Sequence, residues 1–167
     1  MKLDDLTKLY VSNLKDMRDA EQQMTDALPG LVEKASSAEL KAALKEHLTT
    51  TESHLDTVEQ LLEAATGSKR GKKCKGMAGL VEEGKEVLES EGDPDVIDAG
   101  LIVAAQKAEH YEMAAYGSLK AFAQMLGNRE AAKLFDEILD EERRADRRLS
   151  EIAESLINAE AAAAGSH

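Results

Sequence analysis

The chain has no tryptophan, two prolines and one cysteine, and aromatic side chains make up only 3% of its 167 residues. This scarcity, together with abundant Ala, Leu, Glu and Lys, is typical of an all-helical protein. A single cysteine, Cys74, excludes an internal disulfide, so we expect a reducing compartment, the cytoplasm. No apolar run approaches the roughly 20 residues of a membrane-spanning helix, and we expect no signal peptide.

Basic residues are also in the minority: 21 Lys and Arg stand against 33 Asp and Glu, a formal charge of −12. Such a surface repels the phosphates of nucleic acids and anionic membranes, so we expect neither as a partner. The length suits one domain with a sizeable core. We place this single domain at residues 1–157 and expect the alanine-rich residues 158–167 to form a frayed tail.

Start signals, stop signals and apolar periodicity predict five helices. Their approximate ranges are residues 4–35, 36–65, 77–90, 93–126 and 128–156. The second begins at a capping-box pattern, Ser36 to Glu39, and Asp93-Pro94 is an N-cap followed by proline at the first helical position. Gly127 ends one helix and Asn128 opens the next.

The lengths of the connections predict how the four long helices are arranged. The first two helices, and the last two, are separated by a residue or two, so each pair is an antiparallel hairpin. The link between the hairpins, residues 66–93, is about 28 residues long and holds the short helix. Helices of roughly 30 residues are about 45 Å long, so this link must run along the bundle. Two hairpins joined by one long crossover form a ferritin-like four-helix bundle.

Three of the long helices carry a carboxylate in the middle of an otherwise apolar stripe. These residues are Glu21, Glu112 and Glu142. Burying a carboxylate is costly unless it is paired or coordinated. The recurrence of a carboxylate near mid-length in three apolar stripes predicts a shared buried metal site inside the bundle. The alternative is pairing with a buried cation, for which the arginines of residues 143–148 are nearest. We expect the three tyrosines to be core residues rather than redox partners: Tyr10, Tyr111 and Tyr116.

Ferritin-like di-metal proteins draw carboxylates and histidines from all four helices, often three residues apart. Glu109 precedes Glu112 by three residues and Asp146 follows Glu142 by four, so each pair shares a helix face. The second long helix offers His54, with His47 on the same side. Oxygen donors with a few imidazoles suit iron or manganese. The predicted ligands are Glu21, His54, Glu109, Glu112, Glu142 and Asp146.

Four segments resemble the hallmarks of the YciE/YciF family, bacterial stress-associated proteins of the ferritin-like, rubrerythrin-related superfamily. They are residues 19–23, 72–80, 99–112 and 139–142. The resemblance runs from Leu6 to about Ile152 and implies a four-helix bundle, a di-metal centre and a short helix at a homodimer interface. The chain departs from the family pattern at two places, and each departure removes side chains that could bind a metal. Thr49-Thr50-Thr51 stands where the family commonly has acidic residues, and Ala145 replaces a histidine of ferritins and rubrerythrins.

The resemblance implies a role in stress protection, with peroxide as one candidate substrate. No rubredoxin-type Cys-x-x-Cys pair is present, so a peroxidase of this kind would need an external electron donor. Catalase-like disproportionation at a dimanganese centre would not need such a donor. The alternative function is a non-enzymatic structural homodimer with a degenerate or empty metal site.

The short helix at residues 77–90 has an apolar face but is too short to be stable alone in water. It docks either on its own bundle or on a second copy of the chain. Because the resemblance places it at a twofold interface, we expect a homodimer with Leu80 and Val81 near the axis. The basic residues between Lys69 and Lys75 would then lie beside the acidic face of the partner.

Overall fold

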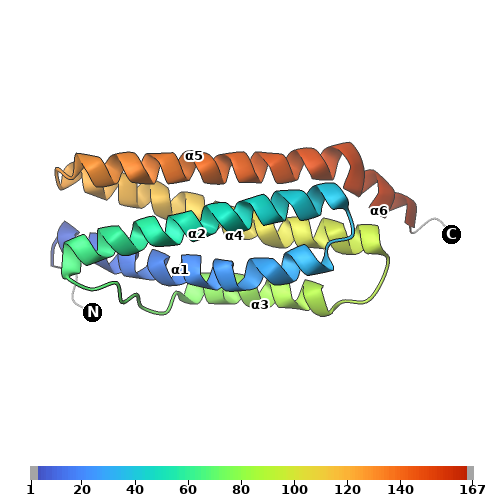
Figure 1. The fold of residues 1–167 in the computed structure, drawn as a ribbon, viewed down its shortest axis with the longest axis horizontal. Helices are drawn as coiled ribbons and strands as arrows, with labels where there is room; N and C mark the ends of the chain where they lie inside the picture. The colour runs from blue at the N-terminus through green and yellow to red at the C-terminus, as the bar shows by residue number, and fades with distance from the viewer. Residues whose placement is uncertain (1–3, 165–167) are drawn as a thin grey trace.

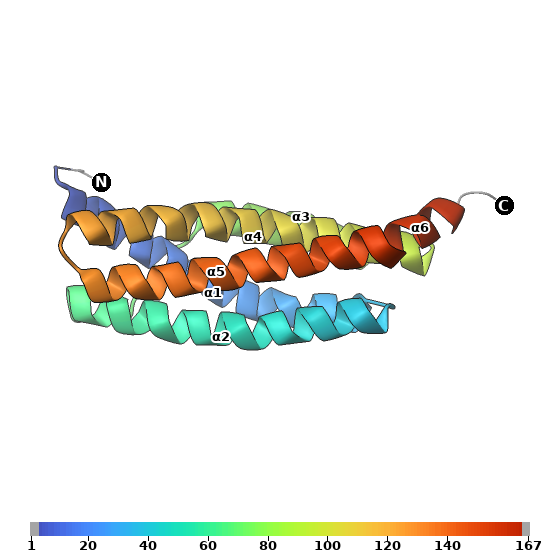
Figure 2. The same ribbon diagram turned by 90° about the horizontal axis from the view of Figure 1, so that it is seen from above.

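The computed structural model describes residues 4–164, and every regular element among them is helical. The elements are α1 Leu6–Lys34, α2 Ala38–Thr66, α3 Lys75–Glu89, α4 Pro94–Met125, α5 Arg129–Ile152, a π-helical turn at Ala153–Ile157 and α6 Asn158–Ala164. Four long helices lie side by side, and α3 runs along α1 and α4 on the side away from α2 and α5 (Figures 1 and 2). Within the described part of the chain, no helix is both long enough and apolar enough to cross a membrane.

The predicted topology is confirmed. α1 with α2, and α4 with α5, form two antiparallel hairpins, and the chain crosses from one hairpin to the other through residues 67–93, which contain α3 (Figure 1). This is the ferritin-like four-helix arrangement. The hairpins bring the middles of all four long helices to the same level of the bundle.

Side-chain caps fix where the helices start. The side chains of Asp93 and Asn128 accept hydrogen bonds from the backbone N–H groups of Asp95 and Ala131, each at 3.0 Å. Gly127 has a φ of +77°, which favours glycine at the turn between α4 and α5. The start of α2 differs from the prediction by one residue, because Ser37 is its N-cap.

Asp98 of α4 explains that difference. Its carboxylate is fully buried and accepts three hydrogen bonds: from the Ser36 N–H at 2.8 Å, the Ser36 hydroxyl at 2.7 Å and the Ser37 N–H at 2.7 Å. Ser36 is therefore occupied in joining the second hairpin to the first. Helix periodicity and capping signals do not reveal this contact, because its partners are about 60 residues apart.

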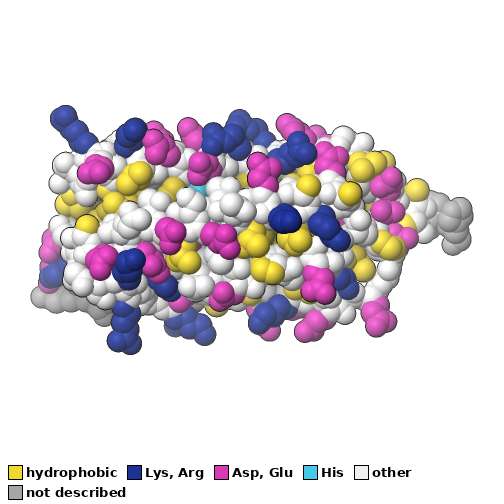
Figure 3. Space-filling model, in the orientation of Figure 1, with side chains coloured by type: hydrophobic (Ala, Val, Ile, Leu, Met, Phe, Trp, Pro, Cys, Tyr) yellow, Lys and Arg dark blue, Asp and Glu magenta, His cyan; other side chains and the backbone are white. Residues whose placement is uncertain are grey.

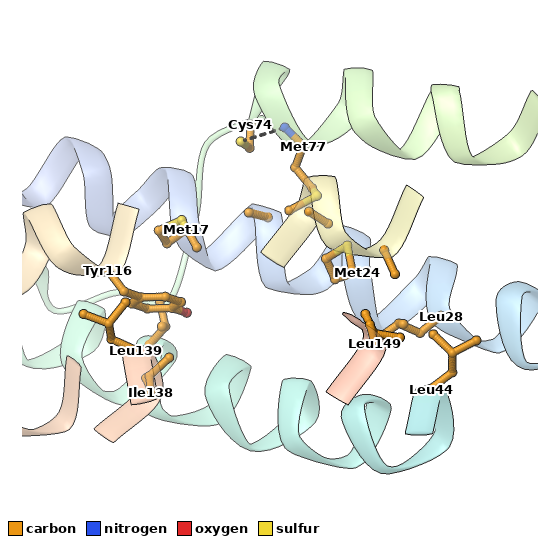
Figure 4. Close-up of a cluster of buried hydrophobic side chains, with 14 of the residues drawn as sticks. Met17, Met24, Leu28, Leu44, Cys74, Met77, Tyr116, Ile138, Leu139 and Leu149 are labelled. Carbon is orange, nitrogen blue, oxygen red and sulfur yellow. Dashed lines mark hydrogen bonds between the residues drawn. The ribbon is translucent and has the colours of Figure 1, made fainter. Parts of the chain in front are cut away.

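The apolar core lies in two groups along the bundle axis. Figure 4 shows Met17, Tyr116, Ile138 and Leu139 on one side and Met24, Leu28, Leu44 and Leu149 on the other. Glu21 lies between Met17 and Met24 along α1 and is itself fully buried. A polar layer therefore separates the two apolar groups.

The crossover is anchored on its own bundle. Met77 and Gly84 of α3 are buried. In the loop before α3, the Lys72 Nζ lies 2.9 Å from the Ser12 hydroxyl and 3.6 Å from an Asp16 oxygen. Lys69 lies 3.5 Å from a Glu59 oxygen. These two basic residues thus contact acidic residues of α1 and α2 in the same chain.

Cys74 and Tyr111 form a second anchor. The Cys74 sulfur lies 2.9 Å from the Tyr111 hydroxyl, which donates to Asp16 Oδ2 at 3.1 Å. The Tyr111 ring packs against Gly76 so closely that a Cβ at this position would come within 2.6 Å of it. Tyr111, expected as a core residue, therefore also ties α4 to the start of α3 and to α1.

The C-terminal end differs from the prediction. After α5 the chain passes through the π-helical turn and continues as α6, which contacts α4. Residues 158–164 are thus helical rather than frayed, although none of them is buried. The high helix propensity of alanine accounts for this. The remainder of the predicted tail, residues 165–167, lies outside the described residues.

Replacing Asp98 with alanine tests the contact between the hairpins. Asp98→Ala leaves the Ser36 and Ser37 donors without a partner, and we expect the free energy of unfolding to fall by about 3 kcal/mol. Urea denaturation followed by circular dichroism measures the change. The control is Asp56→Ala on the exposed face of α2, expected to change stability by less than about 0.5 kcal/mol. Equal losses in the two variants would contradict the role given to Asp98.

Candidate metal centre

Six buried carboxylate and imidazole side chains meet in the polar layer at mid-length. They come from all four long helices and each is at most 7% exposed. They are Glu21 of α1, His47 and His54 of α2, Glu109 and Glu112 of α4, and Glu142 of α5. The neighbouring residues on each helix stripe are apolar, which draws these polar side chains into the core with them.

The six residues fall into two overlapping groups. Donor atoms of His47, Glu109, Glu112 and Glu142 all lie within 4.8 Å of one another. Donor atoms of Glu21, His54 and Glu142 do the same. Glu142 belongs to both groups. Such an arrangement suits two cations that share one carboxylate.

Five of the six predicted ligands are in these groups: Glu21, His54, Glu109, Glu112 and Glu142. Asp146 is not. Its Oδ1 accepts a hydrogen bond from the Gln106 amide at 3.0 Å and lies 3.4 Å from His110 Nδ1. These contacts hold the Asp146 carboxylate against α4, where Gln106 also donates a hydrogen bond to the Ser150 hydroxyl at 2.9 Å.

His47 takes the place that the prediction gave to Asp146. It precedes His54 by seven residues, nearly two full turns, so both imidazoles lie on the same side of α2. His47 Nε2 lies 2.9 Å from Glu109 Oε1. Thr51, the last of the three threonines noted in the sequence, is buried with its hydroxyl 3.4 Å from His47 Nε2.

Most carboxylate oxygens of the centre lack hydrogen-bond donors among residues 4–164. Seven of their oxygens are buried without a hydrogen bond from any described residue: one of Glu21 and both of Glu109, Glu112 and Glu142. The described Lys and Arg side chains form no ion pair with them; Arg143, Arg144 and Arg148 pair at the surface instead. The histidine nitrogens are close, but their angles are unsuited to hydrogen bonds. The donor set therefore fits cations.

Burial dominates the electrostatics of the acidic groups. It raises the pKa of Glu109 and of Glu112 well above their usual range, and the neighbouring carboxylates raise both further. Burial also raises the pKa of Glu21 to about 7, although the nearby His54 opposes the shift. Without a cation, these carboxylates cannot all be ionised at neutral pH.

The pKa values of the two imidazoles, His47 and His54, shift in opposite directions. Burial lowers the pKa of His47. It also works against the charge on His54, but close contact with Glu142, with Nδ1 2.8 Å from Oε1, and the charge of Glu21 raise the pKa of His54 to about 9. Burial would raise the pKa of Glu142, yet His54, Glu109 and His47 together lower it. His54 and Glu142 thus form the ionised pair of the metal-free centre.

Two further residues hold the candidate ligands in place, and the sequence pattern did not reveal either role. The Tyr116 hydroxyl donates a hydrogen bond to Glu21 Oε1, and its ring lies edge-on to His54 with centroids 6.3 Å apart. Glu141 Oε2 lies 2.7 Å from His54 Nε2, on the far side of the ring from Glu142. Such outer partners orient metal ligands. Tyr116 is a core residue as expected, but it also contacts the centre.

Comparisons with known proteins cover nearly the whole chain. A family model described as a domain of unknown function, DUF892, matches residues 5–162. Protein YciF of Escherichia coli (strain K12) is 40% identical over 162 residues, or 96% of this chain and 98% of that protein.

Solved structures are similar to this chain as well. The crystal structure of the E. coli stress protein YciF has a TM-score of 0.88 at 39% identity, covering 93% of this chain and 98% of that one. YcfI of Rhodopseudomonas palustris, described as a proposed structural protein, has a TM-score of 0.85 at 32% identity, covering 89% and 95%. The family model and the sequence identity, together with the shared fold, show that the chain belongs to the YciF family, whose domain is DUF892.

Proposed function

We propose that this protein binds two iron or manganese ions in the buried centre and serves in the bacterial stress response. The observation that carries the proposal is the set of seven buried carboxylate oxygens without hydrogen-bond donors among the described residues. Four glutamates also match two divalent cations in charge, and two histidines supply nitrogen donors. This mixture of hard oxygens with imidazole suits iron or manganese.

The residues around the centre have separate tasks in this proposal. Glu142 would be shared by both ions, with His47, Glu109 and Glu112 beside one and Glu21 and His54 beside the other. Tyr116 and Glu141 hold Glu21 and His54 in position.

The two apolar groups of the core exclude water along the bundle axis (Figure 4). A bound pair of iron or manganese ions would supply two electrons, one from each ion, which is what the reduction of peroxide to water requires. A role in the stress response is supported by the similarity to the E. coli stress protein, and protection against peroxide is the form of it that we propose. Cys74 is the only cysteine in the chain, so peroxide reduction would draw electrons from an external donor, whereas disproportionation would not.

A second candidate function, a structural homodimer, is favoured by the outer face of α3 and α4. Leu80 and Val103 line a shallow hollow with Tyr111, and Val96 and Val103 are 50% and 54% exposed. Val81 lines the cavity between α3 and its own bundle, to which Leu80 also contributes. We therefore propose a twofold contact centred on Leu80 and Val103. The similar YcfI is described as a proposed structural protein.

Glu112→Gln tests the metal centre. Burial raises the pKa of Glu112 and so favours its neutral form in the metal-free protein, and glutamine, of the same shape, should leave metal-free stability nearly unchanged. Metal content should fall from about two ions per chain to about one or fewer. Elemental analysis of protein from iron- or manganese-supplemented cells measures this. Asp146→Asn, outside both groups, is the control and should retain the metal. Unchanged metal content with stability lowered by about 3 kcal/mol would contradict the ligand role.

The pH dependence of the metal-free protein is a separate test. Glu21, Glu109 and Glu112 have raised pKa values, so their stabilising contribution is complete below about pH 4.5 and is lost as pH rises. His54 acts in the same direction, losing its contribution between its ordinary pKa and about 9. His47, with a lowered pKa, acts in the opposite direction.

The balance predicts that Tm falls by at least about 5 °C between about pH 6 and about pH 9. Calorimetry with a chelator present measures this decline. Manganese should reduce or reverse it, because binding displaces the protons. A metal-free Tm that is constant or rises over this window would contradict the electrostatic description of the centre.

The homodimer is tested by placing charge on the α3–α4 face. Leu80→Glu combined with Val103→Glu should give a folded, helical monomer, because two carboxylates would be buried at the contact. Analytical ultracentrifugation measures the mass. Met125→Glu, at a side chain 79% exposed near the end of α4, is the control and should remain dimeric. A double variant with the mass of the parent would place the interface elsewhere or exclude it.

A further inference from the structure

A polar cleft lies between α2 and α5 and reaches the candidate metal centre. Its volume is about 610 Å³. Small side chains, Ala43, Thr50 and Ala145, form part of its lining, where larger ones would close the space. Ala145 lies three residues after Glu142 and Thr50 three after His47, so both are one turn along from members of the centre.

Two residues connect this cleft to the centre. His47 lines the cleft and also lies 2.9 Å from Glu109 Oε1. Glu141 lines it and contacts His54 at 2.7 Å. In Figure 3 the side of the molecule along which α5 runs carries Lys and Arg side chains interspersed with Asp and Glu. The apolar cavity of about 360 Å³ between α1, α3 and α4, by contrast, is lined by none of the six residues of the centre.

Arginines gather at this cleft on a chain whose net charge is −12. Arg144 pairs with Glu141 at 3.7 Å, and Arg148 pairs with Glu39 at 3.2 Å. Arg147 forms no ion pair or hydrogen bond with the described residues. Glu46 and Glu151 also line the cleft, so its charges are mixed. Arg147 remains available to an incoming anion.

We propose that the α2–α5 cleft is the access route by which a small anion, of a few atoms, reaches the ion on the His47 side of the centre. The proposal rests on the metal-binding function above. Ala145 and Thr50 keep the route open, and Arg147 draws the anion to its mouth. The cations within the centre supply the attraction at the inner end.

Azide is the probe, because it binds ferric ions and changes their absorption spectrum. Iron-loaded parent protein, Ala145→Phe and Ala42→Phe are titrated with azide after their iron content is measured. Ala42 is exposed on α2 beside the cleft residue Ala43, which makes it a matched control. We expect equal iron in all three proteins, azide binding weakened at least about tenfold in Ala145→Phe, and parental binding in Ala42→Phe.

Arg147→Glu provides a variant that does not depend on core packing, since Arg147 is exposed. We expect it to slow azide association, with the largest effect at low salt, where charges are least screened. Parental azide binding in both Ala145→Phe and Arg147→Glu, with iron content intact, would overturn the access route alone. A parent protein that retains no iron would overturn the metal-binding function together with the access route.

Discussion

The structure depends on how four carboxylates can be held together inside an apolar bundle. Glu21, Glu109, Glu112 and Glu142 are each no more than 1% exposed, and desolvation alone opposes their ionisation. Asp98 shows how this protein stabilises an isolated buried carboxylate: three donors from the α1–α2 connection surround it. The four glutamates receive no such set, so their arrangement is suited to cations rather than to structure alone.

The rest of the fold serves to bring these groups together. The two hairpins align the middles of the long helices, and Asp98 fixes one hairpin against the other. The crossover covers the side of α1 and α4, with Cys74 and Tyr111 as its anchor, and the cavity beneath it is lined by none of the six residues of the centre. On the side between α2 and α5, His47 meets the surface cleft. Of these two hollows, the cleft is the one that gives access to the centre.

The sequence predicted what depends on local spacing. Connection lengths gave the topology, and carboxylates within apolar stripes gave Glu21, Glu112 and Glu142. Asp146, predicted from its spacing of four after Glu142, instead contacts Gln106 and His110 of α4, and spacing along one helix does not reveal such a contact. Contacts between helices left no periodic signal: Tyr116 with Glu21 and Asp98 with Ser36 join residues far apart in the chain. Residues 158–164 were expected to be frayed because they lie at the end of the chain without apolar periodicity, but their alanines favour a helix.

The most direct test of the central claim is anomalous diffraction at the manganese edge from crystals of manganese-loaded protein. The account predicts two strong peaks inside the bundle, one on either side of Glu142, with His47 beside one and His54 beside the other. Both should disappear from crystals of protein stripped by a chelator. No peak within the bundle, or peaks confined to surface carboxylates, would contradict the account and leave the buried glutamates to be stabilised by protonation.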